Sequence, residues 1–222
     1  MNLDSYKEII RNLNPIEQCI YFDHNHWINF KYNNPVITTE VSYISKNYQN
    51  GISRKDIISY LSKENSSIRI GFLLTMIWGH GYSEHGKADN RGPWKVSKML
   101  HNIEDSNLIL EGAKYHLKQN DLESAYTCFD NMDRCRVNFF SKFLYFLGRS
   151  LNMNYYPLIF DTRVAKTMGR LTLDSDLFSI LEIQPKQSSA AYCSYIKKIH
   201  SIADKLELEA ENIEYFLFNG TI

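Results

Sequence analysis

One apolar segment constrains the fold of this chain more than any other feature. Residues 66–79 read SSIRIGFLLTMIWG, and after the two serines apolar side chains occupy nearly every side of a helix. A helix without a polar face must be covered all round by other elements. A chain of 222 residues is long enough to form the core that such coverage requires. We therefore predict one globular domain, residues 1–222, built around a central helix at 66–79.

The rest of the chain shows helical rather than alternating apolar spacing, which predicts an all-α fold of about ten short helices. Ser53 precedes one of these segments and is expected to cap a helix over 53–64. The segment 16–37 is rich in aromatic and β-branched residues, so a strand or an irregular path also stays open there.

The composition limits the classes of function. Twenty-five basic residues balance 25 acidic ones, so any nucleic-acid site must be a local patch rather than a general excess of charge. No apolar run has the length of a membrane span, and the first residues do not resemble a signal peptide. The four cysteines form no CxxC pair, which favours a reducing compartment. We expect a cytoplasmic monomer that does not bind membranes.

The segment 79–94, GHGYSEHGKADNRGPW, interrupts the helical pattern. It holds four of the ten glycines and almost no aliphatic residue, which predicts a long loop. Loops of this length in a compact domain are usually functional or disordered. Its histidines, with those of DHNH at 23–26, also allow a metal-enzyme hypothesis on His24, His26, His80 and His85. Neither segment matches HExxH or a paired-cysteine zinc spacing, so we expect no metal and no cofactor.

Lys142 lies near the start of an amphipathic helix expected over 139–151. The opposite side of this helix is apolar, whereas Lys142 shares its own side with Tyr145, Phe146 and Arg149. Aromatic rings beside charges are unusual on a solvated face, so this side either borders a cleft or is an ordinary surface. From this helix alone, both interpretations stay open.

Asp161 follows the apolar PLIF and opens a helix expected over 161–171. Aspartate is a common N-cap, because its carboxylate accepts hydrogen bonds from unpaired backbone N–H groups. The positive end of a helix also keeps a carboxylate ionised, so a cap and a catalytic role are compatible. Between 133 and 170 the chain carries seven basic residues against Asp133 and Asp161, which is consistent with a solvated face or with phosphate contacts.

The order of these segments resembles the helix-hairpin-helix DNA glycosylases, and in particular their 8-oxoguanine DNA glycosylase branch. A helix at 121–132, a turn at 133–138, Lys142 near the next helix start and Asp161 nineteen residues later fill the places of the family motif. The resemblance covers roughly residues 66–171. It implies an all-α, two-lobed helical bundle with a helix-hairpin-helix and a cleft between the lobes. One lobe would hold about 66–138, and the other 1–65 plus 139–222.

The resemblance also implies roles for individual residues. Lys142 and Asp161 would be the catalytic pair, and double-stranded DNA with a modified base would be the partner. Candidates for the base pocket, or for the wedge that fills the gap left by a flipped base, are Trp78, His80, Tyr82, His85, Asn90, Arg91 and Trp94. Candidates for DNA phosphate binding are Arg134, Arg136, Asn138, Ser141 and Arg163.

The turn departs from the family motif. The family hairpin is typically LPGxG, whose glycines let backbone N–H groups approach a phosphate, whereas this chain reads CRVNFFSK. Asn138 tolerates a left-handed backbone, and Arg134 and Arg136 offer side-chain contacts instead.

The loop 79–94 and its flanks resemble a subgroup of small prokaryotic glycosylase-like proteins, some of which excise glucosylated cytosines in anti-phage defence. In that case Glu84, Asp89 and Asn90 would hydrogen-bond sugar hydroxyls. The expected function is therefore excision of a modified base that leaves an abasic site, with glucosylated hydroxymethylcytosine as one target. The alternatives are an 8-oxoguanine glycosylase with AP-lyase activity and a non-catalytic helical DNA-binding module. The sequence leaves open whether Lys142 or water attacks the sugar.

Overall fold

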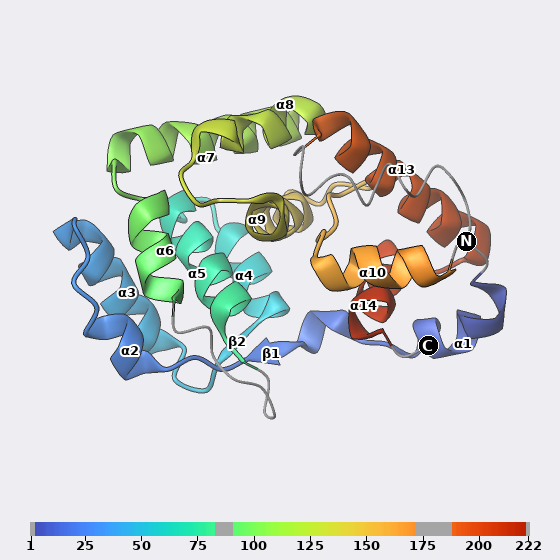
Figure 1. Ribbon diagram of the computed structural model, residues 1–222, viewed down its shortest axis with the longest axis horizontal. Coiled ribbons are helices and arrows are strands. Elements are labelled where there is room, and N and C mark those ends of the chain that lie inside the picture. The colour runs from blue at the N-terminus through green and yellow to red at the C-terminus, as the bar shows by residue number, and fades with distance from the viewer. Residues whose placement is uncertain (1–2, 83–90, 172–187, 221–222) are drawn as a thin grey trace.

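The computed structural model, which describes residues 3–82, 91–171 and 188–220, confirms the all-α prediction (Figure 1). The only sheet among these residues has two short strands. The helices are η1 (Asp4–Tyr6), α1 (Lys7–Arg11), η2 (Pro15–Glu17), α2 (His24–Ile28), α3 (Pro35–Asn47), α4 (Arg54–Leu61), α5 (Ile68–His80), α6 (Gly92–Met99), α7 (Ile103–Lys118), α8 (Leu122–Thr127), η3 (Cys128–Asn131), α9 (Val137–Ser150), α10 (Thr162–Leu171), α13 (Ser189–Leu206) and α14 (Ala210–Asn219). The strands are β1 (Cys19–Ile20) and β2 (Ile52–Ser53).

Helix α5 is the central helix that its apolar sequence predicts. Most of its side chains are buried, and it packs against α3, α4, α6, α7 and α9. The hydroxyl of Ser67 caps its first turn by accepting the N–H of Ile70 at 3.3 Å. Helix α5 therefore ends, at Gly79 and His80, inside the protein rather than on an outer face.

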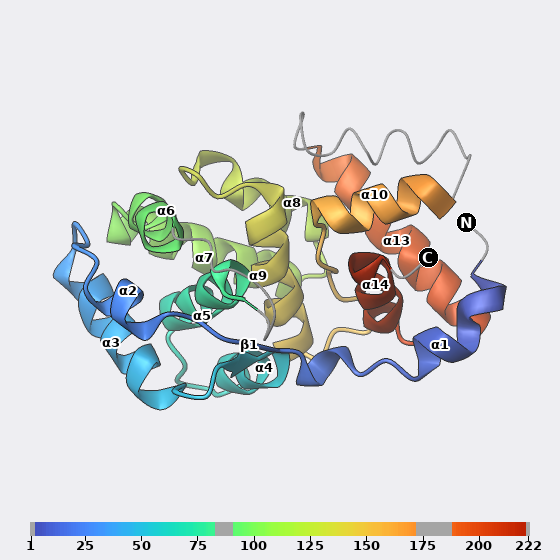
Figure 2. The same ribbon diagram turned by 60° about the horizontal axis from the view of Figure 1, so that its bottom comes forward.

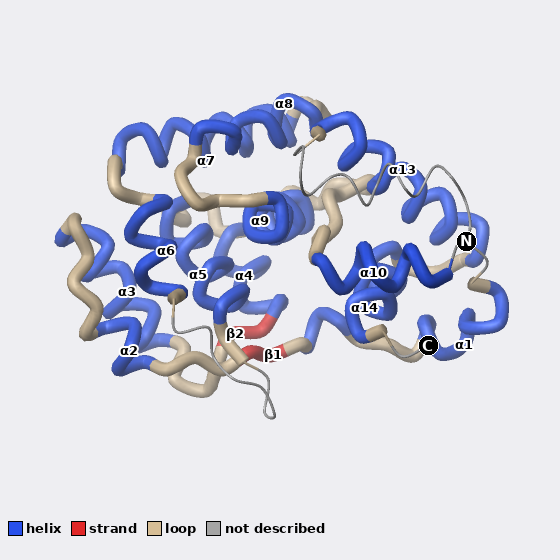
Figure 3. The backbone as a smooth tube through the Cα atoms, viewed as in Figure 1, coloured by secondary structure: helices blue, strands red, loops and turns tan. Residues whose placement is uncertain are grey.

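The segment 16–37 contains a strand and a helix rather than one regular element. Strands β1 and β2 are antiparallel, with Cys19 opposite Ser53 and Ile20 opposite Ile52 (Figure 3). Ser53 is also the N-cap of α4, as predicted, and forms a capping box with Asp56. This arrangement brings Gln18 and Arg54 beside the end of α5.

The helices form two groups, with α9 running between them (Figure 2). Helices α3, α4, α6 and α7 pack on α5, whereas α10, α13 and α1 pack on α14. Of the N-terminal helices, α3 and α4 pack on α5, and α2 packs on α3 and α6. The lobe boundaries predicted from the sequence stay a prediction. A single hydrophobic cluster runs through both groups. No helix in the described ranges has the length and apolar character to cross a membrane.

Candidate functional site: a lysine–aspartate pair in a polar cavity

Helix α9 brings Lys142 into the interior instead of leaving it on the surface. The side chain is only 8% exposed, and its Nζ atom donates to the backbone oxygen of Asn138, one turn earlier. Gly79 makes room for it, because a Cβ at that position would come within 3.2 Å of the lysine Cδ. The side of α9 that carries Lys142, Tyr145 and Phe146 is thus buried in the protein interior.

A buried extended segment positions Asp161. The hydroxyls of Tyr192 and Tyr195 on α13 donate to the backbone oxygens of Leu158 and Ile159 at 2.7 and 3.0 Å. The backbone N–H of Phe160 donates to the hydroxyl of Ser141 at 3.1 Å. Ser141 is completely buried, so it holds this segment rather than facing a phosphate as predicted.

The structure brings Lys142 and Asp161 together. Lysine Nζ and aspartate Oδ2 are 3.4 Å apart, whereas Oδ1 accepts the backbone N–H of Arg163 at 3.0 Å. Asp161 thus caps the start of α10 with one oxygen and pairs with Lys142 through the other. The aspartate side chain is 23% exposed, so the pair opens toward solvent.

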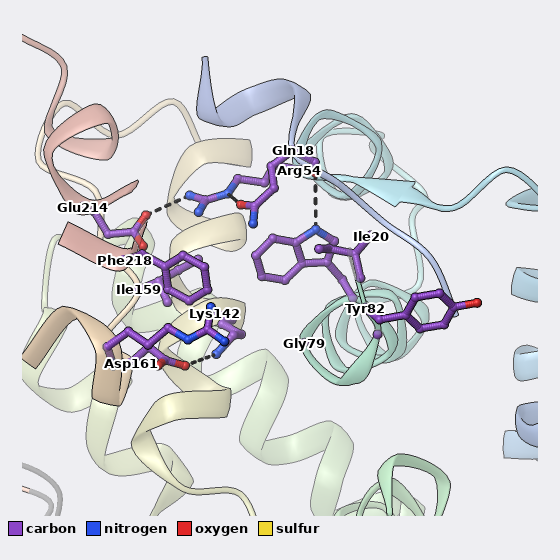
Figure 4. A pocket seen from close by; sticks show the side chains of 13 residues that line it. Gln18, Ile20, Arg54, Gly79, Tyr82, Lys142, Ile159, Asp161, Glu214 and Phe218 are labelled. Atoms are coloured by element: carbon purple, nitrogen blue, oxygen red, sulfur yellow. Dashed lines mark hydrogen bonds and ion pairs between the residues drawn. The ribbon is translucent and has the colours of Figure 1, made fainter. Parts of the chain in front are cut away.

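The pair lines a cavity of about 320 Å³ that both groups of helices form (Figure 4). Its other lining residues are Gln18, Ile20, Arg54, Trp78, Gly79, Gly81, Tyr82, Ile159, Arg163, Glu214 and Phe218. In Figure 4 the ring of Phe218 is seen between the Lys142–Asp161 pair and a second ion pair, Arg54 with Glu214. The cavity thus combines two ion pairs with aromatic walls, which is the composition of a specific ligand site.

The second pair is more deeply buried than the first. Arg54 Nη1 and Glu214 Oε2 are 2.8 Å apart, with side chains 1% and 0% exposed. Arg54 also donates to Gln18 Oε1 at 2.9 Å, and its guanidinium lies 5.4 Å from the ring of Trp78. Burial raises the pKa of Glu214, and Arg54 opposes that shift.

Burial lowers the pKa of Lys142, because the charged ammonium loses its hydration inside the protein. Asp161 opposes the shift, and the positive charge of Arg54 adds to it. The result is an amine that loses its proton at a lower pH than a solvated lysine does. A lower pKa favours the neutral amine, which is the nucleophilic form of lysine.

The structure gathers only part of the predicted pocket set. Trp78 and Tyr82 line the cavity, although Tyr82 lies at the side away from Lys142 (Figure 4). Arg163, which was predicted as a phosphate ligand, also lines it. His80 is buried and stacks on Phe139 at 4.4 Å, outside the lining set. Arg91 is exposed just before α6. His85 and Asn90, with Glu84 and Asp89, lie outside the described residues.

Trp94 and the predicted phosphate ligands lie around the start of α9. Trp94 is on α6, 40% exposed, and the guanidinium carbon of Arg134 is 5.4 Å from its ring. Arg134 and Arg136 are exposed in the turn, whereas Asn138 is half-buried in α9. The left-handed residue of the turn is Arg134, with φ of 60°, and not Asn138.

The metal hypothesis gains no ligand set from the described residues. Within them, no group of three or more His, Cys, Asp and Glu side chains is placed to hold a metal ion. The ring of His24 instead hydrogen-bonds the hydroxyl of Ser45 at 2.7 Å.

Sequence reasoning missed Gln18, Arg54, Glu214 and Phe218. Glu214 and Phe218 are four positions apart, which was a signal that they share one face of a helix. Arg54 gives no such signal, because its partner is 160 residues away.

One comparison with known proteins gives a match. The model of a family described as "Putative 8-oxoguanine DNA glycosylase OGG-like protein" matches residues 14–218. Neither the curated proteins nor the solved structures give a match. The matched range contains every residue that lines the cavity.

Proposed function

The chain belongs to this OGG-like 8-oxoguanine DNA glycosylase family, and from this premise we propose that it excises a modified base from duplex DNA at Lys142 and Asp161. DNA glycosylase is the activity class of the family, and the choice of base is our proposal. The observation that carries it is the buried lysine 3.4 Å from a partly exposed aspartate, at the edge of a cavity of about 320 Å³.

In the proposed reaction the target nucleotide leaves the duplex, because the glycosidic bond is shielded inside the stack. The neutral amine of Lys142 attacks C1′ of the deoxyribose as the bond between C1′ and the base breaks, and the base takes the bonding electrons. Asp161 stabilises the positive charge that develops on the sugar. It is also placed to accept the proton that the amine then loses, since its Oδ2 is 3.4 Å from Nζ.

The resulting covalent adduct opens to a Schiff base between Lys142 and the sugar. Hydrolysis of this Schiff base leaves an abasic site, and elimination of the 3′ phosphate cuts the strand. AP-lyase activity therefore follows directly from attack by the lysine. Attack by water, with Lys142 still charged, would release the base without any adduct.

The cavity supports binding of a polar base between aromatic walls. Phe218 offers a ring on the α14 side, and Trp78 offers one on the α5 side. Glu214 Oε1 is buried and has no hydrogen-bond partner among the described residues, so an N–H group of the base would satisfy it. Glucosylated hydroxymethylcytosine, encountered in anti-phage defence, is the first target that we propose, and 8-oxoguanine is the second.

A panel of duplexes tests this function. The protein is incubated with otherwise identical duplexes carrying 8-oxoguanine, hydroxymethylcytosine, glucosylated hydroxymethylcytosine or no modification, and free base is measured by mass spectrometry. We expect release from one modified duplex and none from the unmodified one. The Lys142→Gln variant controls for contaminating glycosylases. Absence of release from every duplex, phage DNA included, would contradict the proposal.

A further inference from the structure

The last turn of α5 is held in place by the chain that follows β1. Tyr21 and Tyr82 exchange backbone hydrogen bonds, at 2.9 Å in each direction. Gly81 allows this pairing, because a Cβ there would overlap the backbone oxygen of Tyr21. The backbone of α5 just before it, at Gly79, therefore has a defined place beside the cavity.

Gly79 faces the side chain of Lys142. A Cβ at Gly79 would lie 3.2 Å from the lysine Cδ, 3.6 Å from its Cε and 3.8 Å from Cδ1 of Phe139. Carbon atoms in ordinary contact are about 3.5–4.0 Å apart, so the first of these contacts would force the two groups apart. The methylenes of Lys142 thus lie against bare backbone. Glycine is a poor helix former, so helix formation does not account for its presence at this position.

This contact determines where the amine lies. The lysine side chain runs back toward the N-terminus of α9, where Nζ donates to the backbone oxygen of Asn138. Nζ is also 3.4 Å from Asp161 Oδ2. Gly79 and Lys142 both line the cavity (Figure 4), so a methyl group between them would push the side chain off α5 and toward the open space of the cavity. The amine would then leave its place between the Asn138 carbonyl and Asp161.

We propose that Gly79 is a positioning residue for the reacting amine. Its missing side chain lets Lys142 lie against α5, which keeps Nζ beside Asp161. The inference deepens the proposed function and rests on it, because only a lysine that reacts needs its amine held in one place. A misplacement of about 1 Å can lower the rate of an enzymatic step by roughly 10²-fold.

The charges around the amine stay the same when Gly79 changes. The charged and titratable groups that line the cavity beside Lys142 or contact the neighbouring ring of Phe139 are Asp161 before α10, Arg163 on α10, Glu214 on α14, Arg54 on α4, His80 on α5 and Lys95 on α6. Gly79→Ala removes none of them. An amine displaced toward the cavity gains hydration, so its pKa should rise toward the ordinary value of 10.5.

A double-mutant cycle tests the contact without DNA. In Lys142→Ala the added methyl group of Gly79→Ala has no lysine side chain to meet. The effect of Gly79→Ala on the melting temperature should therefore be more favourable in Lys142→Ala than in the wild type, by roughly 2–4 °C. Equal effects in the two backgrounds would overturn the contact.

Gly112→Ala is the matched control variant. Gly112 lies within α7, and a Cβ there would meet only Cys128 Sγ, at an ordinary 3.4 Å. It makes the same change away from the cavity. Its effect on the melting temperature should be the same in the wild type and in Lys142→Ala.

The titration of Lys142 separates positioning from simple packing. Trace acetic anhydride labels neutral amines, and the labelling rate of Lys142 across pH, mapped by mass spectrometry, gives its pKa. Gly79→Ala should raise this pKa by roughly 0.5–1 unit, and Gly112→Ala should not. Single-turnover excision by Gly79→Ala should be roughly 10-fold slower near neutral pH and should recover as the pH rises.

The melts and the labelling need no substrate, so they can fail independently of the proposed function. Base release by the wild type, with an unchanged Lys142 pKa and excision rate in Gly79→Ala, would overturn the positioning role alone. A coupled melt and a raised pKa in a protein that releases no base from any duplex would contradict the proposed function alone.

Discussion

Two ion pairs line the same cavity, and they differ in how deeply they are buried. Arg54 and Glu214 are 2.8 Å apart and almost fully buried, whereas Lys142 and Asp161 are 3.4 Å apart and open toward solvent. The first pair joins α4 to α14, and the second joins α9 to the start of α10. The cavity therefore lies between one ion pair that is shielded from solvent and another that solvent can reach.

The identity of the cations reinforces this difference. Arginine stays charged at any physiological pH, so Arg54 holds Glu214 whatever the ligand does. Burial instead lowers the pKa of Lys142, so this lysine loses its proton at a lower pH than a solvated lysine does. We propose that Arg54 shapes the cavity and that Lys142 reacts in it. The predictions below test this assignment, from the largest expected effect to the smallest.

Lys142→Gln should have the largest effect. Removing a covalent nucleophile leaves only positioning and electrostatic effects, so base release should fall by roughly 10³-fold or more. Single-turnover excision, measured on the duplex that the wild type processes, checks this. The melting temperature should change little, because glutamine, like the neutral amine of Lys142, carries no charge. Excision at the wild-type rate would assign the attack to water.

Arg54→Met should mainly affect stability. Removing one partner of a buried ion pair leaves the other uncompensated, which typically costs about 3–5 kcal/mol. Urea denaturation gives the free energy of unfolding. The double variant Arg54→Met with Glu214→Leu is the control and should recover much of the loss. If Arg54→Met has the same free energy of unfolding as the wild type, the Arg54–Glu214 pair does not hold α4 to α14.

Two substitutions of Asp161 separate its capping role from its catalytic role. Asparagine caps a helix as well as aspartate does, so Asp161→Asn should keep stability while excision falls by roughly 10²–10³-fold. Asp161→Ala should lose the same activity and, in addition, about 1 kcal/mol of stability. Thermal melts and excision rates measured on both variants make the comparison. Full activity in Asp161→Asn would show that Asp161 caps α10 and has no catalytic role.

The pH dependence of stability gives the smallest expected effect. The pKa of Lys142 is lower in the folded protein than its ordinary value of 10.5, so above the folded pKa the unfolded chain binds more protons. The free energy of unfolding should therefore rise with pH between the folded pKa and 10.5. Lys142→Met should lack this part of the rise. Parallel curves for the two proteins would show that Lys142 is not perturbed.

Local patterns predicted much of the fold, whereas the Lys142–Asp161 pair was predicted from a family resemblance. The apolar run at 66–79 predicted the central helix, and Ser53 predicted the start of α4. The pairing of Lys142 with Asp161 came from the resemblance to the glycosylase family, and the structure places the two side chains 3.4 Å apart. The first two features depend on neighbours in the chain, which a sequence displays directly.

The features that were missed depend on distant parts of the chain. Arg54 reads as an exposed residue in SRKD, and only the approach of α14 buries it against Glu214. The acidic stretch before 214 likewise reads as solvated, although Glu211 and Glu214 are buried. Arg134 was expected only as a phosphate ligand, because glycine or asparagine is the usual left-handed residue. Long-range packing outweighed local preference at each of these positions.

Reductive trapping tests the central claim most directly. The protein is incubated with the duplex that it processes in the presence of sodium borohydride, and the protein–DNA adduct is digested and mapped by mass spectrometry. The account predicts a stable adduct on the peptide containing Lys142, absent in Lys142→Gln and retained in Gly112→Ala. Base release without an adduct, or an adduct on another residue, would contradict it.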